Sequence, residues 1–157
     1  MHDIAFVMPQ WAFSVIIWRL YCLFGQWGPY VFSSLMWLGC DIMMIVVARD
    51  VGGNRPASDA GAILAAILLM PFHDVRPSSV SLLLLLAVLH VCLAYVRDGR
   101  RGRLTWIPVL SMLLVNFHAS LWPMMFVIAL PFVASRLYVL VTDRFHVRRP
   151  VPGMPTS

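Results

Sequence analysis

The sequence predicts an all-α fold, a polytopic transmembrane helical bundle with about five membrane segments, two of them short, and one further N-terminal helix. Hydrophobic residues make up 61 % of the 157 residues and charged residues 12 %, whereas soluble domains average about 25 % charged residues. Apolar runs recur from Trp11 to Val141 with only brief polar interruptions, as expected where lipid is the outer solvent. A soluble fold is therefore disfavoured.

The first apolar segment, residues 10–27, has two interpretations, because Arg19 lies near its middle among three tryptophans. As a transmembrane segment it must pair or snorkel Arg19, at a cost of about 2.5 to 3.5 kcal/mol. As an interfacial helix it places tryptophan and arginine where the membrane surface favours them. The interfacial interpretation is preferred, and both stay open.

The next three segments differ in length. Residues 29–48 form a full transmembrane segment interrupted by Asp41. Residues 61–72 supply only about 18 Å of helix, too short for a hydrocarbon core of about 30 Å. Residues 79–96 form a leucine-rich transmembrane segment that carries His90.

Two more segments complete a single membrane domain over residues 1–143. Residues 104–117 form the second short segment, and residues 121–141 form the last transmembrane segment, with Pro131 as an expected kink. Residues 144–157 are predicted to be a disordered cytoplasmic tail.

The arginines predict the orientation, since cytoplasmic loops carry the excess of basic residues. Placing residues 97–103 in the cytoplasm puts the loop 49–55 and the C-terminus there too, while the turns 73–78 and 116–120 lie outside. The basic residues, all arginine, flank membrane segments and do not line a groove, so nucleic acid is not an expected partner. The expected partner is the lipid bilayer.

A polar cavity is expected on the outer side, because both short segments end in polar turns at membrane depth. Irregular backbone is tolerated there only where it is buried in protein or lines a water-filled cavity. Serine caps at the following helix N-termini, beside an arginine, favour an anion such as phosphate. The alternative, that these residues only cap helices and complete loops, stays equally open. The candidate lining residues are His73, Asp74, Arg76, Asn116, His118 and Ser120.

Asp41 and His90 are the clearest ionisable residues inside transmembrane segments. Asp41 lies eight positions before Arg49 and His90 seven before Arg97, on two segments that run in the same direction, so a shared depth is expected. A mutual hydrogen bond would lower the cost of both. A structural pair is preferred over a proton relay. Metal-ligand spacing is lacking, and the residues indicate no cofactor.

Three motifs carry a family resemblance: Pro-Gln-Trp at residues 9–11, Arg-Pro at 76–77, and Leu-Val-Asn-Phe-His-Ala-Ser-Leu-Trp at 114–122. Over residues 9–135 their order and spacing resemble the N-terminal half of bacterial polytopic membrane proteins similar to GT-C-type glycosyltransferases. The resemblance implies an outward-facing site in a bacterial inner membrane protein and a polyprenyl-phosphate-linked sugar as donor.

By the same resemblance Asn116 and His118 would line that site, Arg76 could meet a phosphate, and a divalent metal enters only by family analogy. The chain departs from the family, whose members begin with a transmembrane helix and an essential acidic residue in the following loop; Asp3 does not match that residue. Two hypotheses follow: a glycosyltransferase or a fragment of one, and a non-catalytic subunit of another membrane protein, a small transporter or an inactive truncated fragment.

Overall fold

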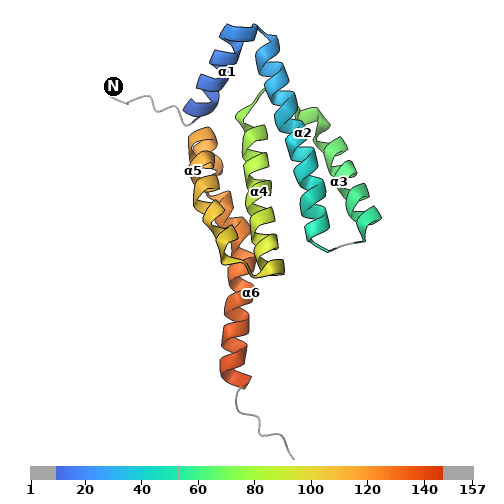
Figure 1. Ribbon diagram of the computed structural model, residues 1–157, viewed down its shortest axis with the longest axis vertical. Coiled ribbons are helices and arrows are strands. Elements are labelled where there is room, and N and C mark those ends of the chain that lie inside the picture. Colours follow the sequence, from blue (N-terminus) through green and yellow to red (C-terminus); the bar gives the residue numbers. More distant parts are fainter. Residues whose placement is uncertain (1–9, 53, 147–157) are drawn as a thin grey trace, which may run out of the picture.

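The computed structural model describes residues 10–52 and 54–146, which form α-helices and short 3-10 segments without any strand (Figure 1). The α-helices are α1 (Trp11–Phe24), α2 (Trp27–Asp50), α3 (Arg55–Leu69), α4 (Pro77–Asp98), α5 (Trp106–His118) and α6 (Met124–His146). The 3-10 segments are η1 (Met70–Phe72), η2 (Arg101–Thr105) and η3 (Ala119–Leu121).

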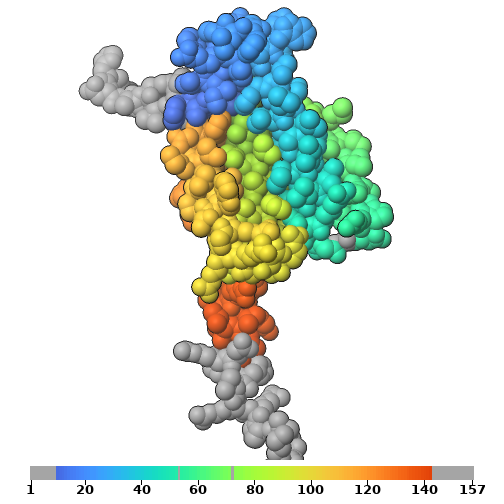
Figure 2. Space-filling model, in the orientation of Figure 1, coloured from blue at the N-terminus to red at the C-terminus, as the bar shows by residue number. Residues whose placement is uncertain are grey.

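Four helical runs within the described residues are long and apolar enough to cross a membrane. They are Trp27–Asp50, Pro77–Asp98, Arg101–Leu121 and Met124–Thr142. The predicted fold class, an all-α polytopic bundle, is therefore confirmed. Figure 2 shows the packed helices in space-filling form, with α6 continuing past the others at one end.

The segment predicted at 104–117 is longer than expected. α5 itself has 13 residues, but η2 and η3 extend it into a run of 21 residues, Arg101–Leu121, which is long enough by residue count for a hydrocarbon core of about 30 Å. Arginine, glycine and serine at its two ends look like loop residues by hydropathy, yet helical backbone bonds do not require apolar side chains. The turn after α5 therefore loses the main reason for placing it at membrane depth.

The other short segment is also longer than predicted. α3 begins at Arg55, six residues before the predicted start, and continues directly into η1, but it is not among the four long apolar runs. Arg49 and Asp59 close the turn between α2 and α3 with an ion pair of 2.8 Å, and the hydrogen bonds from Arg49 hold the pKa of Asp59 below its usual value. Both side chains are exposed, so this ion pair contributes little to the stability of the protein and mainly fixes the geometry of the turn.

α1 favours the interfacial interpretation by its length, because 14 residues reach only about 21 Å. It ends at Gly25, whose φ of 60° lies in the left-handed region. The chain then reverses into α2, and α1 packs against both α2 and α5. At Gly28 a Cβ atom would lie 2.5 Å from the carbonyl oxygen of Leu20, so only glycine permits this close approach.

α4 is the central helix, packed against α2, α5 and α6 (Figure 1). Small side chains bring it close to α2: Cys40 Sγ lies 3.3 Å from the carbonyl oxygen of Ser79, and a Cβ at Gly39 would lie 3.4 Å from Leu83. On the other side Val88 of α4 packs with residues of α5 and α6 in the buried core.

This packing offsets the two parallel helices. Since residue 40 of α2 is level with residue 79 of α4, the start of α4 is level with about residue 38, and α2 begins eleven residues earlier, at Trp27. Eleven residues correspond to about 16 Å of helix. The first part of α2 therefore has no part of α4 beside it, and the connection from η1 to α4 lies there instead.

Two predictions fall partly on the C-terminal region. Residues 144–146 belong to α6, so the expected disordered tail is wrong at its start. Residues 147–157 lie outside the described part of the chain. α6 includes Pro131, the expected kink position, within a continuous helix.

Candidate functional site

The connection between η1 and α4 is fastened to α2 by two side chains that share one acceptor. Ser33 Oγ and Trp37 Nε1 donate to the backbone carbonyl oxygen of Asp74, at 3.0 and 3.5 Å. The indole of Trp37 also stacks on the imidazole of His73, with ring centroids 4.3 Å apart and planes 28° apart. A polar turn is thereby held against an apolar helix, and its backbone is partly satisfied.

A half-open cavity of about 230 Å³ lies beside this turn. One face of α2 supplies most of the wall, and the turn supplies the rest. The lining residues are Tyr30, Ser33, Ser34, Trp37, Leu38, Asp41, His73 and Val75. Hydroxyl, carboxylate and imidazole groups therefore converge on a space that is open to the surroundings of the bundle.

Asp41 is the residue of this cavity with an unsatisfied buried polar atom. Its Oδ1 atom is buried and has no hydrogen-bond partner within the described part of the chain. A buried carboxylate oxygen without a partner is costly, and such atoms are uncommon in folded proteins. Water or a ligand with a hydrogen-bond donor would satisfy this oxygen.

The predicted hydrogen bond between Asp41 and His90 is wrong. His90 Nδ1 lies 2.5 Å from Oδ2 of Asp50, the last residue of α2. The prediction assumed that the two arginine-bearing ends of α2 and α4 are level, whereas the contacts of small residues at their interface shift α4 by about nine residues, or two and a half turns. Asp41 thus lines the cavity together with His73, whereas His90 belongs to the charge network around Asp50.

The structure places the six predicted cavity residues in different environments. His73 lines the cavity, and Asp74 contributes its carbonyl oxygen as the anchor of the turn. Arg76 and the Asp74 carboxylate form an exposed ion pair at 3.0 Å. The serine caps expected for α4 are absent: Ser79 and Ser81 instead donate to the carbonyl oxygens of Arg76 and Pro77 in the preceding turn.

The second predicted turn does not line this cavity. Asn116 donates to the carbonyl oxygen of Met112 on its own helix, and Ser120 lies exposed in η3. His118 has a buried Nδ1 without a hydrogen-bond partner in the part of the chain that the structure describes. The single cavity expected from two turns is therefore built by one turn and by α2.

Sequence reasoning missed the α2 wall, although a signal was present. The wall residues on α2 follow helical spacing: Tyr30, Ser33, Ser34, Trp37, Leu38 and Asp41 occupy positions i, i+3, i+4, i+7, i+8 and i+11. Such spacing places side chains on one helix face. A stripe of polar and aromatic residues that leads to a charged residue inside a transmembrane segment is the pattern that could have identified the site.

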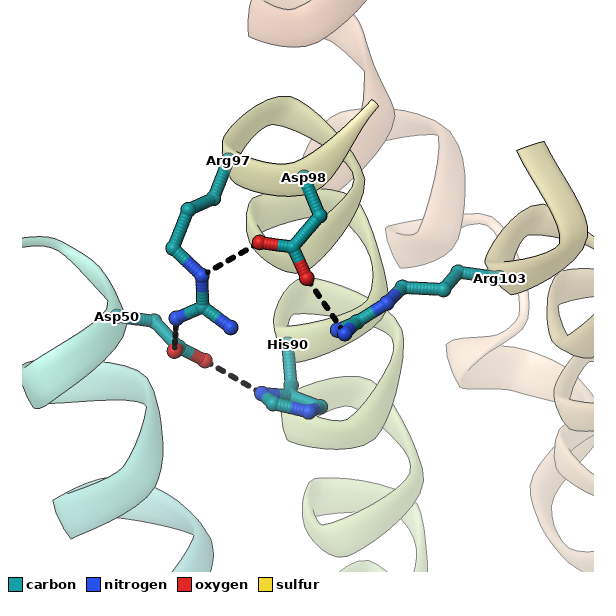
Figure 3. Close-up of polar contacts among 5 residues, drawn as sticks. All are labelled: Asp50, His90, Arg97, Asp98 and Arg103. Carbon is teal, nitrogen blue, oxygen red and sulfur yellow. Dashed lines mark hydrogen bonds and ion pairs between the residues drawn. The ribbon is translucent and has the colours of Figure 1, made fainter. Parts of the chain in front are cut away.

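A charge network ties the helices together at the other end of the bundle (Figure 3). The carboxylate of Asp50, only 8 % exposed, accepts from His90 at 2.5 Å and from Arg97 at 2.6 Å. Asp98 accepts from Arg97 at 3.0 Å and from Arg103 of η2 at 2.6 Å. Because its two carboxylates are balanced by two guanidinium groups, this network serves as a structural clamp between α2, α4 and η2.

Fold and site together define the class: a multi-pass helical membrane protein with a small polar cavity at one end and an arginine-rich clamp at the other. Comparisons of the chain with protein-family models, with curated proteins and with solved structures found no match.

Proposed function

We propose that this membrane protein binds the polar group of a lipid-linked substrate in the cavity beside α2, at the outer face of the membrane. The observation that carries the proposal is the buried Oδ1 of Asp41, which has no hydrogen-bond partner among the described residues, in a cavity that also presents hydroxyl and imidazole groups between apolar side chains. A ligand hydroxyl would donate to this oxygen and so remove the cost of leaving it unsatisfied.

The size and chemistry of the cavity favour a single sugar unit as that polar group. Its volume of about 230 Å³ is below the range of about 300 to 1,000 Å³ that is usual for drug-sized ligands. Ser33 and Ser34 donate their hydroxyl protons to backbone carbonyls and can still accept hydrogen bonds from the hydroxyls of a sugar, and the imidazole of His73 can donate or accept one. The open side of the cavity would let the lipid tail of the substrate remain in the bilayer.

Arg76 supports a phosphate beside the sugar. It lies three residues after His73, and its side chain is 69 % exposed, with Asp74 as its ion-pair partner. An exposed guanidinium can exchange that carboxylate for a phosphate, which it recognises with the same pair of N–H groups. This agrees with the resemblance to GT-C-type glycosyltransferases, so we propose a polyprenyl-phosphate-linked sugar as the substrate. In a transfer reaction Asp41 would be the candidate base for the acceptor hydroxyl.

The orientation belongs to the same proposal. The loops 49–55 and 97–103 lie at the arginine-rich end, which we assign to the cytoplasm of a bacterial inner membrane, together with the C-terminal end of α6. The cavity then opens toward the outer face.

Binding of a polyprenyl-phosphate mannose to the full chain in lipid nanodiscs tests the proposal. The same lipid without its sugar is the reference ligand. We expect the sugar-bearing lipid to bind about tenfold more tightly, and the variant Asp41→Asn to remove that preference, because the lost bond is charge-assisted. Asp59→Asn, at an exposed ion pair on α3, is the matched control and should retain it. Equal affinity of the two lipids for the unmodified chain would refute the proposal.

A second candidate function is a non-catalytic subunit of a larger membrane assembly. The supporting observation is α3, which is not among the four long apolar runs and leaves Ile63, Leu64, Ile67 and Leu68 exposed. A partner helix could cover this face. Sugar transfer by the purified chain alone, abolished by Asp41→Asn and kept by Asp59→Asn, would favour the enzyme; binding without transfer would favour the subunit.

A further inference from the structure

A second cavity, distinct from the one beside α2, lies at the arginine-rich end. It is a groove of about 650 Å³ between the end of α4, the start of α5 and α6, within the range of about 300 to 1,000 Å³ that is usual for ligand sites. Its wall consists mainly of apolar side chains, including Val96, Leu104 and Phe132. Arg136 of α6 is the one charged residue of that wall.

Arg136 lies inside the apolar run Met124–Thr142, where a charged side chain costs about 2.5 to 3.5 kcal/mol on the insertion scale. Among residues 10–52, 54–71 and 73–142, whose side chains the structure describes, Arg136 forms no ion pair, and it is exposed along the groove. An anionic group bound at this place would lower the cost of this charge within the membrane.

The neighbouring arginines make the mouth of the groove positive. Arg97 and Arg103 are neutralised by the carboxylates of the clamp in Figure 3. Arg100 and Arg101, in contrast, are exposed and take part in no ion pair with the side chains of residues 10–52, 54–71 and 73–142. They lie in the chain between two residues of the groove wall, Val96 and Leu104, so the excess positive charge is close to its rim.

We propose that this groove binds an anionic phospholipid, whose phosphate bonds Arg136 and the rim arginines and whose acyl chain lies along the apolar wall. Arginine forms paired hydrogen bonds to phosphate, and basic pockets between transmembrane helices are a recurrent site for anionic headgroups. Residues 129 to 140 of α6 line the groove over about 16 Å, half of a hydrocarbon core of about 30 Å. That length matches the acyl chain of one leaflet.

Two features favour a lipid over a second copy of the chain. The residues Leu137 to Val141 are consecutive, apolar and exposed, so α6 is apolar on every side there, and lipid can cover all sides whereas one packed helix covers a single face. A second copy in the same orientation would also bring its own arginine-rich end to the same depth, where like charges repel.

Native mass spectrometry of the full chain, with phosphatidylglycerol or phosphatidylcholine added to detergent micelles, tests the proposal. We expect phosphatidylglycerol to bind at least tenfold more tightly than phosphatidylcholine. Arg136→Gln should reduce this preference about tenfold, because it removes a charge-assisted contact. Val133→Trp, which fills the groove from an exposed position, should weaken both lipids alike.

Arg19→Gln is the matched control, since Arg19 is an exposed arginine on α1 and lies outside the groove wall. It should leave the preference for phosphatidylglycerol unchanged. Equal affinity for the two lipids, or an undiminished preference in Arg136→Gln, would overturn the proposal. So would a purified dimer that Val133→Trp converts to monomer, because the groove would then be an interface between copies.

Discussion

The link between Asp50 and His90 allows a direct test of the helix register. The hydrogen bond joins the last residue of α2 to a residue in the second half of α4, at 2.5 Å, with the Asp50 side chain 8 % exposed. Interhelical hydrogen bonds in membrane proteins contribute about 0.6 kcal/mol on average, and bonds to charged groups about 1.5 to 3 kcal/mol. For this largely buried carboxylate we expect a coupling free energy of about 1.5 kcal/mol, roughly a tenfold change in the unfolding equilibrium.

A double-mutant cycle of Asp50→Asn and His90→Gln measures that coupling as the free energy of unfolding in detergent. The same cycle with Asp41→Asn in place of Asp50→Asn is the matched control, because Asp41 is the partner that the sequence predicted for His90. We expect coupling near zero for Asp41 and His90, since they lie at different levels of the bundle. Coupling as large for Asp41 as for Asp50 would refute the register derived from the α2 and α4 interface.

Further outcomes concern packing and topology. Leu114→Ala, at a side chain with no exposed surface in the core of α4, α5 and α6, should lower the free energy of unfolding by about 2 to 4 kcal/mol, measured by denaturant titration; a loss below about 1 kcal/mol would contradict the packing. Gly28→Val should separate α1 from α2, detected as faster proteolysis after α1, and an unchanged cleavage pattern would argue against the close approach. In a chain without Cys22, a cysteine at Val75 should react with impermeant reagent on intact cells while one at Gly99 stays protected, and the reverse pattern would invert the proposed orientation.

Much of the fold was predictable because hydropathy and segment length depend on local sequence. The helices at residues 29–48 and 79–96 agree with α2 and α4 to within a few residues. The segment at 104–117 was predicted too short, since hydropathy marks apolar side chains whereas a helix continues wherever backbone hydrogen bonds can form. Arg101 and Ser120 are both polar, and both lie in helical turns.

The candidate site was less predictable because it depends on how helices slide past each other. Contacts of small residues such as Gly39, Cys40 and Ser79 set the level of α4 against α2, and a single sequence does not state which small residues meet. Because of this offset, His90 bonds to Asp50 and not to Asp41, and Asp41 is left to line the cavity. His73 lies in a polar turn between apolar helices, which is a local signal in the sequence, and it lines the cavity beside α2.

Trp37 has two tasks, and this limits which variants can report on the cavity. One edge of its indole holds the carbonyl of Asp74, while its face supports the ring of His73, so the wall of the cavity is also the fastening of the turn. Replacing Trp37 would remove one of the two donors to the Asp74 carbonyl, leaving Ser33 as the other, and would reshape the cavity in the same step. Effects on binding and on folding can therefore be separated only at cavity residues that make no hydrogen bond to the turn. Asp41 and Ser34 are such positions.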